Sequence, residues 1–75
     1  MKIEVLGPNC KKCEFVHQRV LEACRRADVA ADVEKVSRME RILAYGILAT
    51  PAVAIDGRVV MSGRVPALKE IREWI

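Results

Sequence analysis

The sequence lacks the features that mark membrane-spanning, secreted and nucleic-acid-binding proteins. No apolar run approaches the roughly 18 residues that a transmembrane helix needs, and the apolar start of the chain ends at Gly7-Pro8. That start is too short for the core of a signal peptide, so we expect a cytoplasmic protein without a membrane partner. Only three residues are aromatic, and the net charge of +3 is spread along the chain. We therefore expect no nucleic-acid partner.

Histidine is scarce, with one among 75 residues, and the cysteines number three. An odd number of cysteines in a short cytoplasmic chain argues against a structural disulfide framework. The composition does provide 52% hydrophobic and 31% charged residues, which excludes a disordered chain. The length suits one small domain, which we assign to residues 1–75.

The first half of the chain predicts a strand, a long helix and a second strand. Residues 2–6 are short, apolar and followed by Gly-Pro, which is typical of a mostly buried strand. From Cys10 to about Ala27, apolar positions recur every three or four residues, which indicates an amphipathic helix with Asn9 as its N-cap. Residues 29–36 hold the apolar Ala31 and Val33 with the charged Asp32 and Glu34 between them, so we expect a strand at the edge of the sheet.

The second half predicts a short helix, a hairpin and a last helix. A capping-box pattern at residues 37–40 starts a helix through about Tyr45, and the next residue, a glycine, is placed to end it. Asp56-Gly57 between an apolar run, 52–55, and the return strand, 58–61, is a hairpin signal. Pro66 suits the first position of a helix over 66–75. The order β-α-β-α-β-β-α predicts an α/β fold: a mixed four-stranded sheet with helices on both faces.

Two cysteines stand at the start of the long predicted helix, in Cys10-Lys11-Lys12-Cys13. Free backbone N–H groups and the helix dipole stabilise an anion at such an end, and the two lysines add positive charge, so the pKa of Cys10 should be lowered. Cys13 lies almost one turn further on, within reach of Cys10, and on the core-facing stripe. This asymmetry suits disulfide exchange, with Cys10 as nucleophile and Cys13 as resolving thiol.

A second motif, Thr50-Pro51, opens the third predicted strand. Proline cannot donate to a sheet ladder, so it must lie at the start of that strand. The peptide bond before it is either an ordinary trans bond or a cis bond, which only proline allows at modest cost. A cis bond would bend the loop towards Cys10 and expose backbone groups with which a substrate peptide could pair.

These motifs together resemble those of the thioredoxin/glutaredoxin superfamily. They are the Cys-Lys-Lys-Cys segment after the first strand, Thr50-Pro51 before the third, the Asp-Gly hairpin and Gly63 before the last helix. The length and the Gly-Pro-Asn-Cys opening are most similar to those of the small glutaredoxin-like thioredoxins. The resemblance implies a thioredoxin fold, dithiol–disulfide exchange at Cys10 and Cys13, and a cis Pro51 facing them. It also implies that Gly63 helps to line the substrate groove.

Glu4 lies six residues before Cys10, as does an acidic residue on the first core strand of thioredoxins. We interpret Glu4 either as a group that moves a proton to or from Cys13, or as a carboxylate on an uncovered part of the sheet. The third cysteine, Cys24, is about 16 Å from Cys13 along the helix, too far to bridge, and is expected to be a buried apolar residue.

The function that we predict is reduction of disulfides in proteins or small molecules, with an external, thioredoxin-reductase-like enzyme as electron donor. The dithiol itself is the redox group, so no organic cofactor and no metal is expected. A metal-binding module is the alternative from another class, because Cys10, Cys13 and His17 form a plausible three-ligand set for zinc or copper. A redox-sensing adaptor that uses the same two cysteines also stays open.

Overall fold

The computed structural model describes residues 1–75 and contains four strands and three helices. In chain order they are β1 (Lys2–Leu6), α1 (Lys11–Ala27), β2 (Asp32–Val36), α2 (Met39–Ala44), β3 (Ala52–Ile55), β4 (Arg58–Ser62) and α3 (Leu68–Trp74). This is the predicted β-α-β-α-β-β-α order. None of the three helices combines the length and the apolar character that crossing a membrane demands.

The strands form one mixed sheet in the order β2-β1-β3-β4. β1 is parallel to β2 and antiparallel to β3, and β3 and β4 form an antiparallel hairpin. β2 lies at an edge and β1 in the interior, as predicted. The hairpin turns at Asp56-Gly57, where both residues have positive φ angles, the backbone geometry that an Asp-Gly turn readily adopts.

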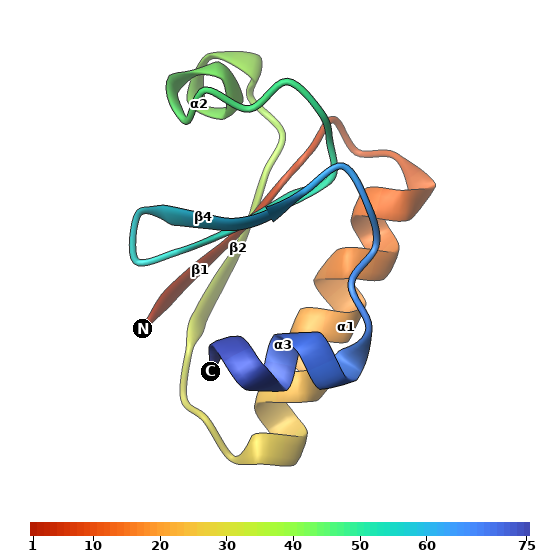
Figure 1. Ribbon diagram of the computed structural model, residues 1–75, viewed down its shortest axis with the longest axis vertical. Coiled ribbons are helices and arrows are strands. Elements are labelled where there is room, and N and C mark those ends of the chain that lie inside the picture. Colours follow the sequence, from red (N-terminus) through yellow and green to blue (C-terminus); the bar gives the residue numbers. More distant parts are fainter.

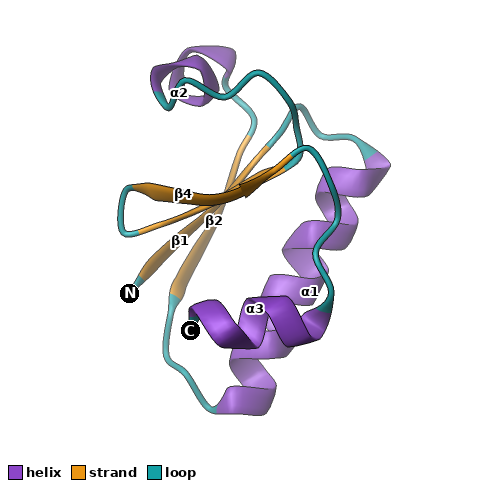
Figure 2. Ribbon diagram, viewed as in Figure 1, coloured by secondary structure: helices purple, strands orange, loops and turns teal.

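Helices cover both faces of this sheet (Figures 1 and 2). α1 and α3 pack together on one face, and alternate residues of β1 and β3 point into their shared core: Ile3, Val5 and Val53. The residues between them face α2 and form a second, smaller core: Leu6, Ala52 and Ala54 with Ile42 of α2. The two-residue period of a strand therefore assigns Glu4 to the α2 face.

The long helix begins one residue later than predicted. Its N-cap is Cys10 and not Asn9, because Cys10 is extended (φ −92°, ψ 167°) and its Sγ accepts the Cys13 N–H at 3.2 Å. Asn9 instead has a positive φ of 39° in the preceding turn. β2 is also shorter than the predicted 29–36, because its pairing starts where β1 starts, at Lys2 opposite Asp32.

The two short helices also start later than the sequence patterns predict. The capping box at Ser37 does not form: Arg38 is the N-cap of α2, and no side chain caps this end. Pro66 does not open α3, whose N-cap is Ala67. The Pro66 carbonyl accepts instead from Arg19 Nη1 at 2.8 Å, so this proline ties the segment before α3 to α1.

Candidate active site

The candidate site lies where β1 passes into α1, at the end of the sheet opposite the two chain termini (Figure 1). Cys10 is exposed and Cys13 is buried, with 2% of its surface accessible. Cys13 is buried because it lies on the face of α1 that packs on the sheet. The structure thus produces the predicted asymmetry between an outer and an inner thiol three residues apart.

The two thiols have pKa values shifted in opposite directions. The pKa of Cys10 is lowered, first by a hydrogen bond from the Cys13 side chain and then by the backbone N–H groups of Cys13 and Lys12. The pKa of Cys13 is raised by burial and by its hydrogen bond with Cys10. The predicted shift is therefore present, but its main cause is the inner thiol and the first helical turn rather than the lysine side chains.

A second segment of the site is the loop that contains Thr50 and Pro51, called the proline loop below. The Thr50–Pro51 peptide bond is cis, as the resemblance implied, and Pro51 is fully buried while Thr50 is exposed. The Gly63 N–H donates to the Pro51 carbonyl at 2.8 Å. Gly63 has a φ of +84°, and a Cβ there would lie 3.3 Å from the Cβ of Ala49. The segment after β4 thus packs closely on the proline loop.

Gly7 connects the cysteines to the proline loop, and sequence reasoning missed it as a site residue. A Cβ at this position would overlap the Cys13 sulfur and would lie 3.8 Å from the Cα of Pro51. The inner thiol can occupy its place only because residue 7 has no side chain. The available signal was the glycine of the Gly-Pro-Asn-Cys segment, which indicated the end of a strand and the family resemblance but not close packing against a sulfur.

Glu4 is buried, 6% exposed, and its carboxylate is held by α2. Arg41 Nη2 donates to one carboxylate oxygen at 2.7 Å, and the Tyr45 hydroxyl donates to the other. Arg41 also bonds Glu34 of β2 at 2.8 Å. Glu4 raises the pKa of Tyr45, because ionising the phenol would cost this hydrogen bond and place two anions together. These contacts with Arg41 and Tyr45 were not predicted.

The other candidate residues are dispersed. Lys11 and Lys12 are exposed on the first turn of α1. Cys24 is buried, and burial raises its pKa, as expected of an apolar core residue. His17 is half-buried, and no group of three His, Cys, Asp or Glu side chains gathers anywhere in the chain in a way that could hold a metal ion. The structure does not assemble the three-ligand set of the alternative interpretation.

A thioredoxin fold with a Cys-x-x-Cys pair at the start of its first helix and a cis proline beside it defines the class of this protein. Comparison with known proteins agrees: the family model described as the thioredoxin domain matches residues 1–75. The chain belongs to the thioredoxin family.

Its relatives include archaeal thioredoxins of similar size. The chain is 34% identical to a thioredoxin of Methanothermobacter thermautotrophicus over 97% of its own length and 95% of the relative's. It is 31% identical to a thioredoxin of Methanocaldococcus jannaschii, over 95% and 81% of the two lengths. A probable thioredoxin of Methanothermobacter marburgensis is 38% identical, over 100% of this chain and 92% of the relative. The resemblance that the sequence motifs indicated is confirmed.

Proposed function

We propose that this protein is a thiol–disulfide oxidoreductase that reduces disulfides through Cys10 and Cys13. The observation that carries the proposal is the opposite pKa shift of two thiols in one helical turn, the outer one lowered and exposed, the inner one raised and buried. A thiolate attacks a disulfide, whereas a thiol does not. Cys10 is therefore the attacking group, and Cys13 stays protonated until the mixed disulfide on Cys10 has formed.

The exchange has two steps in which atoms and electrons balance. The Cys10 thiolate attacks one sulfur of the substrate disulfide, forms a mixed disulfide and releases the other substrate sulfur as a thiolate, which takes up a proton. Cys13 then loses its proton and attacks the Cys10 sulfur, which releases the second substrate thiol. The substrate gains two electrons, and the protein is left with a Cys10–Cys13 disulfide. An external, thioredoxin-reductase-like enzyme would return two electrons to it.

Thr50, Pro51 and Gly63 would bind the substrate in this scheme. Thr50 is exposed at the cis peptide bond, next to the buried Pro51, and Gly63 packs against the same loop. An extended substrate segment would pair with the backbone of this loop as an added strand, which places its disulfide beside Cys10. Lys11 and Lys12, exposed on the first turn of α1, would modulate the surroundings of the outer thiol.

The sequence-based role of Glu4 is to move a proton to or from Cys13, but its carboxylate lies on the α2 face of the sheet, bonded to Arg41 and Tyr45, whereas Cys13 packs from α1 on the other face. Its contacts add a second role, holding α2. The two roles predict different results for Glu4→Gln. Loss of proton transfer changes how the rate of resolution by Cys13 varies with pH, whereas a purely anchoring role lowers stability and leaves that pH profile unchanged. The matched comparison is Tyr45→Phe, which loosens the same anchor and keeps the carboxylate.

The proposal is tested by trapping covalent partners. In Cys13→Ser the mixed disulfide on Cys10 cannot be resolved, so we expect this variant to retain disulfide-bearing proteins that a reductant then releases. Cys10→Ser should retain none, and Cys24→Ser should behave like the wild type. Equal trapping by the Cys10 and Cys13 variants, or by neither, would contradict the assigned roles. A metal-binding module would instead bind one zinc ion per reduced chain tightly and reduce no disulfide.

A further inference from the structure

The cations next to Cys10 differ from most others on the surface because no carboxylate neutralises them. Seven of the thirteen Lys and Arg residues form ion pairs within the chain: Lys2, Arg25, Arg26, Lys35, Arg38, Arg41 and Arg64. Lys11 and Lys12 are exposed and belong to no such pair. Both stand between the two cysteines, so any chain that brings a disulfide to Cys10 must approach them.

The acidic side chain of α1 nearest in sequence to the two lysines is Glu14, and it pairs with a different residue. Glu14 follows Lys11 by three residues, a spacing that commonly allows an ion pair on a helix. Its carboxylate is bonded instead to Lys35 of β2, and this pair lowers the pKa of Glu14. The ion pair across α1 and β2 thus leaves the positive charge at the cysteine end of α1 available to a partner.

An exposed aromatic ring lies on the same helix face. Phe15 is 60% exposed, although α1 has a well-filled core face on its other side. It lines a shallow surface hollow together with Lys11, Glu14 and Gln18, one and two turns from the start of the helix. The floor of this hollow is mostly apolar, since the ring and the aliphatic stems of its neighbours line it. It is large enough for one apolar side chain of a partner.

We infer that this face of α1 selects the substrate: it docks an acidic segment of a disulfide-bearing protein, with an apolar side chain of that segment on Phe15. The inference rests on the proposed function and names the class of its substrate. Carboxylates of the segment meet Lys11 and Lys12, whose charge also speeds the encounter. The aromatic ring then holds the segment beside Cys10.

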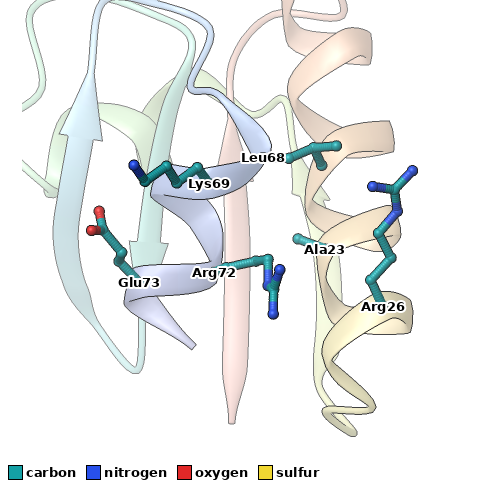
Figure 3. A pocket seen from close by; sticks show the side chains of 6 residues that line it. All are labelled: Ala23, Arg26, Leu68, Lys69, Arg72 and Glu73. Carbon is teal, nitrogen blue, oxygen red and sulfur yellow. The ribbon is translucent and has the colours of Figure 1, made fainter.

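A second cationic area serves as the matched control. Lys69 and Arg72 of α3 line a hollow with residues from the C-terminal half of α1, and both are outside any ion pair (Figure 3). This hollow includes an acid, Glu73, and its other arginine, Arg26, is bonded to Glu22. It lies far along α1 from the cysteines. Changing Lys69 and Arg72 therefore removes the same charge from the protein without touching the proposed docking face.

The test measures the rate at which the pre-reduced protein reduces two disulfide peptides in a single turnover. Both peptides carry one leucine beside the disulfide, and they differ only in four flanking residues, Asp in one and Asn in the other. We expect the Asp peptide to react roughly tenfold faster at low ionic strength, and the ratio to fall towards one as salt is added. The rate with the Asn peptide reports the intrinsic reactivity of Cys10. A change in the pKa of Cys10 therefore alters both rates alike and leaves the Asp-to-Asn ratio unchanged.

Substitutions in the two cationic areas show which of them causes the faster reaction of the Asp peptide. Lys11→Gln with Lys12→Gln should bring the ratio of the two rates close to one, whereas Lys69→Gln with Arg72→Gln should leave it as in the wild type. Phe15→Ser should slow both leucine peptides several-fold relative to peptides with glycine in that place. An Asp-to-Asn ratio near one in the wild-type protein overturns this inference while the Asn peptide is still reduced. Failure to reduce either peptide overturns the proposed function itself.

Discussion

Arg41 of α2 and Glu4 of β1 form a hydrogen-bonded ion pair of 2.7 Å that crosses from a helix to the interior strand of the sheet. The same guanidinium bonds Glu34 on the edge strand, and Tyr45, just after α2, bonds the other oxygen of Glu4. A helix of six residues is too short to be stable alone. These polar contacts, together with the buried Ile42, attach it to the sheet and so position the loop that leads to Pro51.

The first prediction concerns the Tyr45 hydroxyl. Tyr45→Phe leaves one oxygen of the buried Glu4 without its donor, and we expect the protein to lose about 1 kcal/mol of unfolding free energy. Urea unfolding of the reduced protein measures the loss. Tyr45→Phe in a Glu4→Gln background is the control, since the charged acceptor is then already absent and the effect of the hydroxyl should shrink. An equal loss in both backgrounds would show that Tyr45 acts through packing alone.

The second prediction concerns stability in acid. Hydrogen bonds from Arg41 and Lys2 lower the pKa of Glu34 from 4.5 to about 2. Because the pKa is depressed in the folded state, the resulting stability is fully present above pH 4.5 and is lost as the pH falls towards about 2. The urea midpoint of the wild type should therefore fall between pH 5 and pH 2.5, and that of Arg41→Gln should fall less.

Arg64→Gln is the comparison for this acid effect, because Arg64 lowers the pKa of Glu70 to about 2 in the same way, on α3. Each single variant should reduce the fall of the urea midpoint between pH 5 and pH 2.5, and the double variant should reduce it more than either. If Arg41→Gln retained the full wild-type drop, the Arg41–Glu34 pair would not be a source of the acid sensitivity.

The third prediction separates the causes of the low pKa of Cys10. The hydrogen bond from the Cys13 side chain is the largest of them. Cys13→Ala removes this donor and should raise the pKa of Cys10 towards its ordinary value of 9.0, whereas Cys13→Ser keeps an O–H donor and should leave it lower. The rate of alkylation of Cys10 as a function of pH measures both, with Cys24→Ser as background. Identical midpoints in the Ala and Ser variants would assign the shift to the backbone N–H groups.

The fourth prediction concerns Gly7. A methyl group at this position would overlap the Cys13 sulfur, so Gly7→Ala should destabilise the reduced protein by about 1–3 kcal/mol. Combining it with Cys13→Ala removes the sulfur, and the double variant should be more stable than the sum of the two single losses. Additive losses would mean that the strain arises elsewhere, for example in the backbone. Unfolding in urea gives all four free energies of this cycle.

Local signals in the sequence predicted most of the fold. The period-two and period-three-to-four patterns placed all seven elements in the right order, and Asp56-Gly57 turned where an Asp-Gly pair is expected. The errors lie at the ends of elements. Cys10 caps α1 in place of Asn9, and Pro66 lies before α3, with its carbonyl bonded to Arg19 of α1. The Pro66 contact with Arg19 joins residues distant in the sequence, which a local pattern does not contain.

The sequence by itself determined that Cys10 and Cys13 lie within one turn of each other at the start of a helix, with Cys13 on the face that packs on the core. Only the tertiary structure decided which side chains hold Glu4, and that Gly7 and the Thr50–Pro51 loop meet at the inner sulfur. The physical reason is that exposure and close packing are properties of segments brought together by folding. Spacing along the chain determines which residues are neighbours within a helix. The packing of that helix on the sheet and the loops determines which other segments those residues contact.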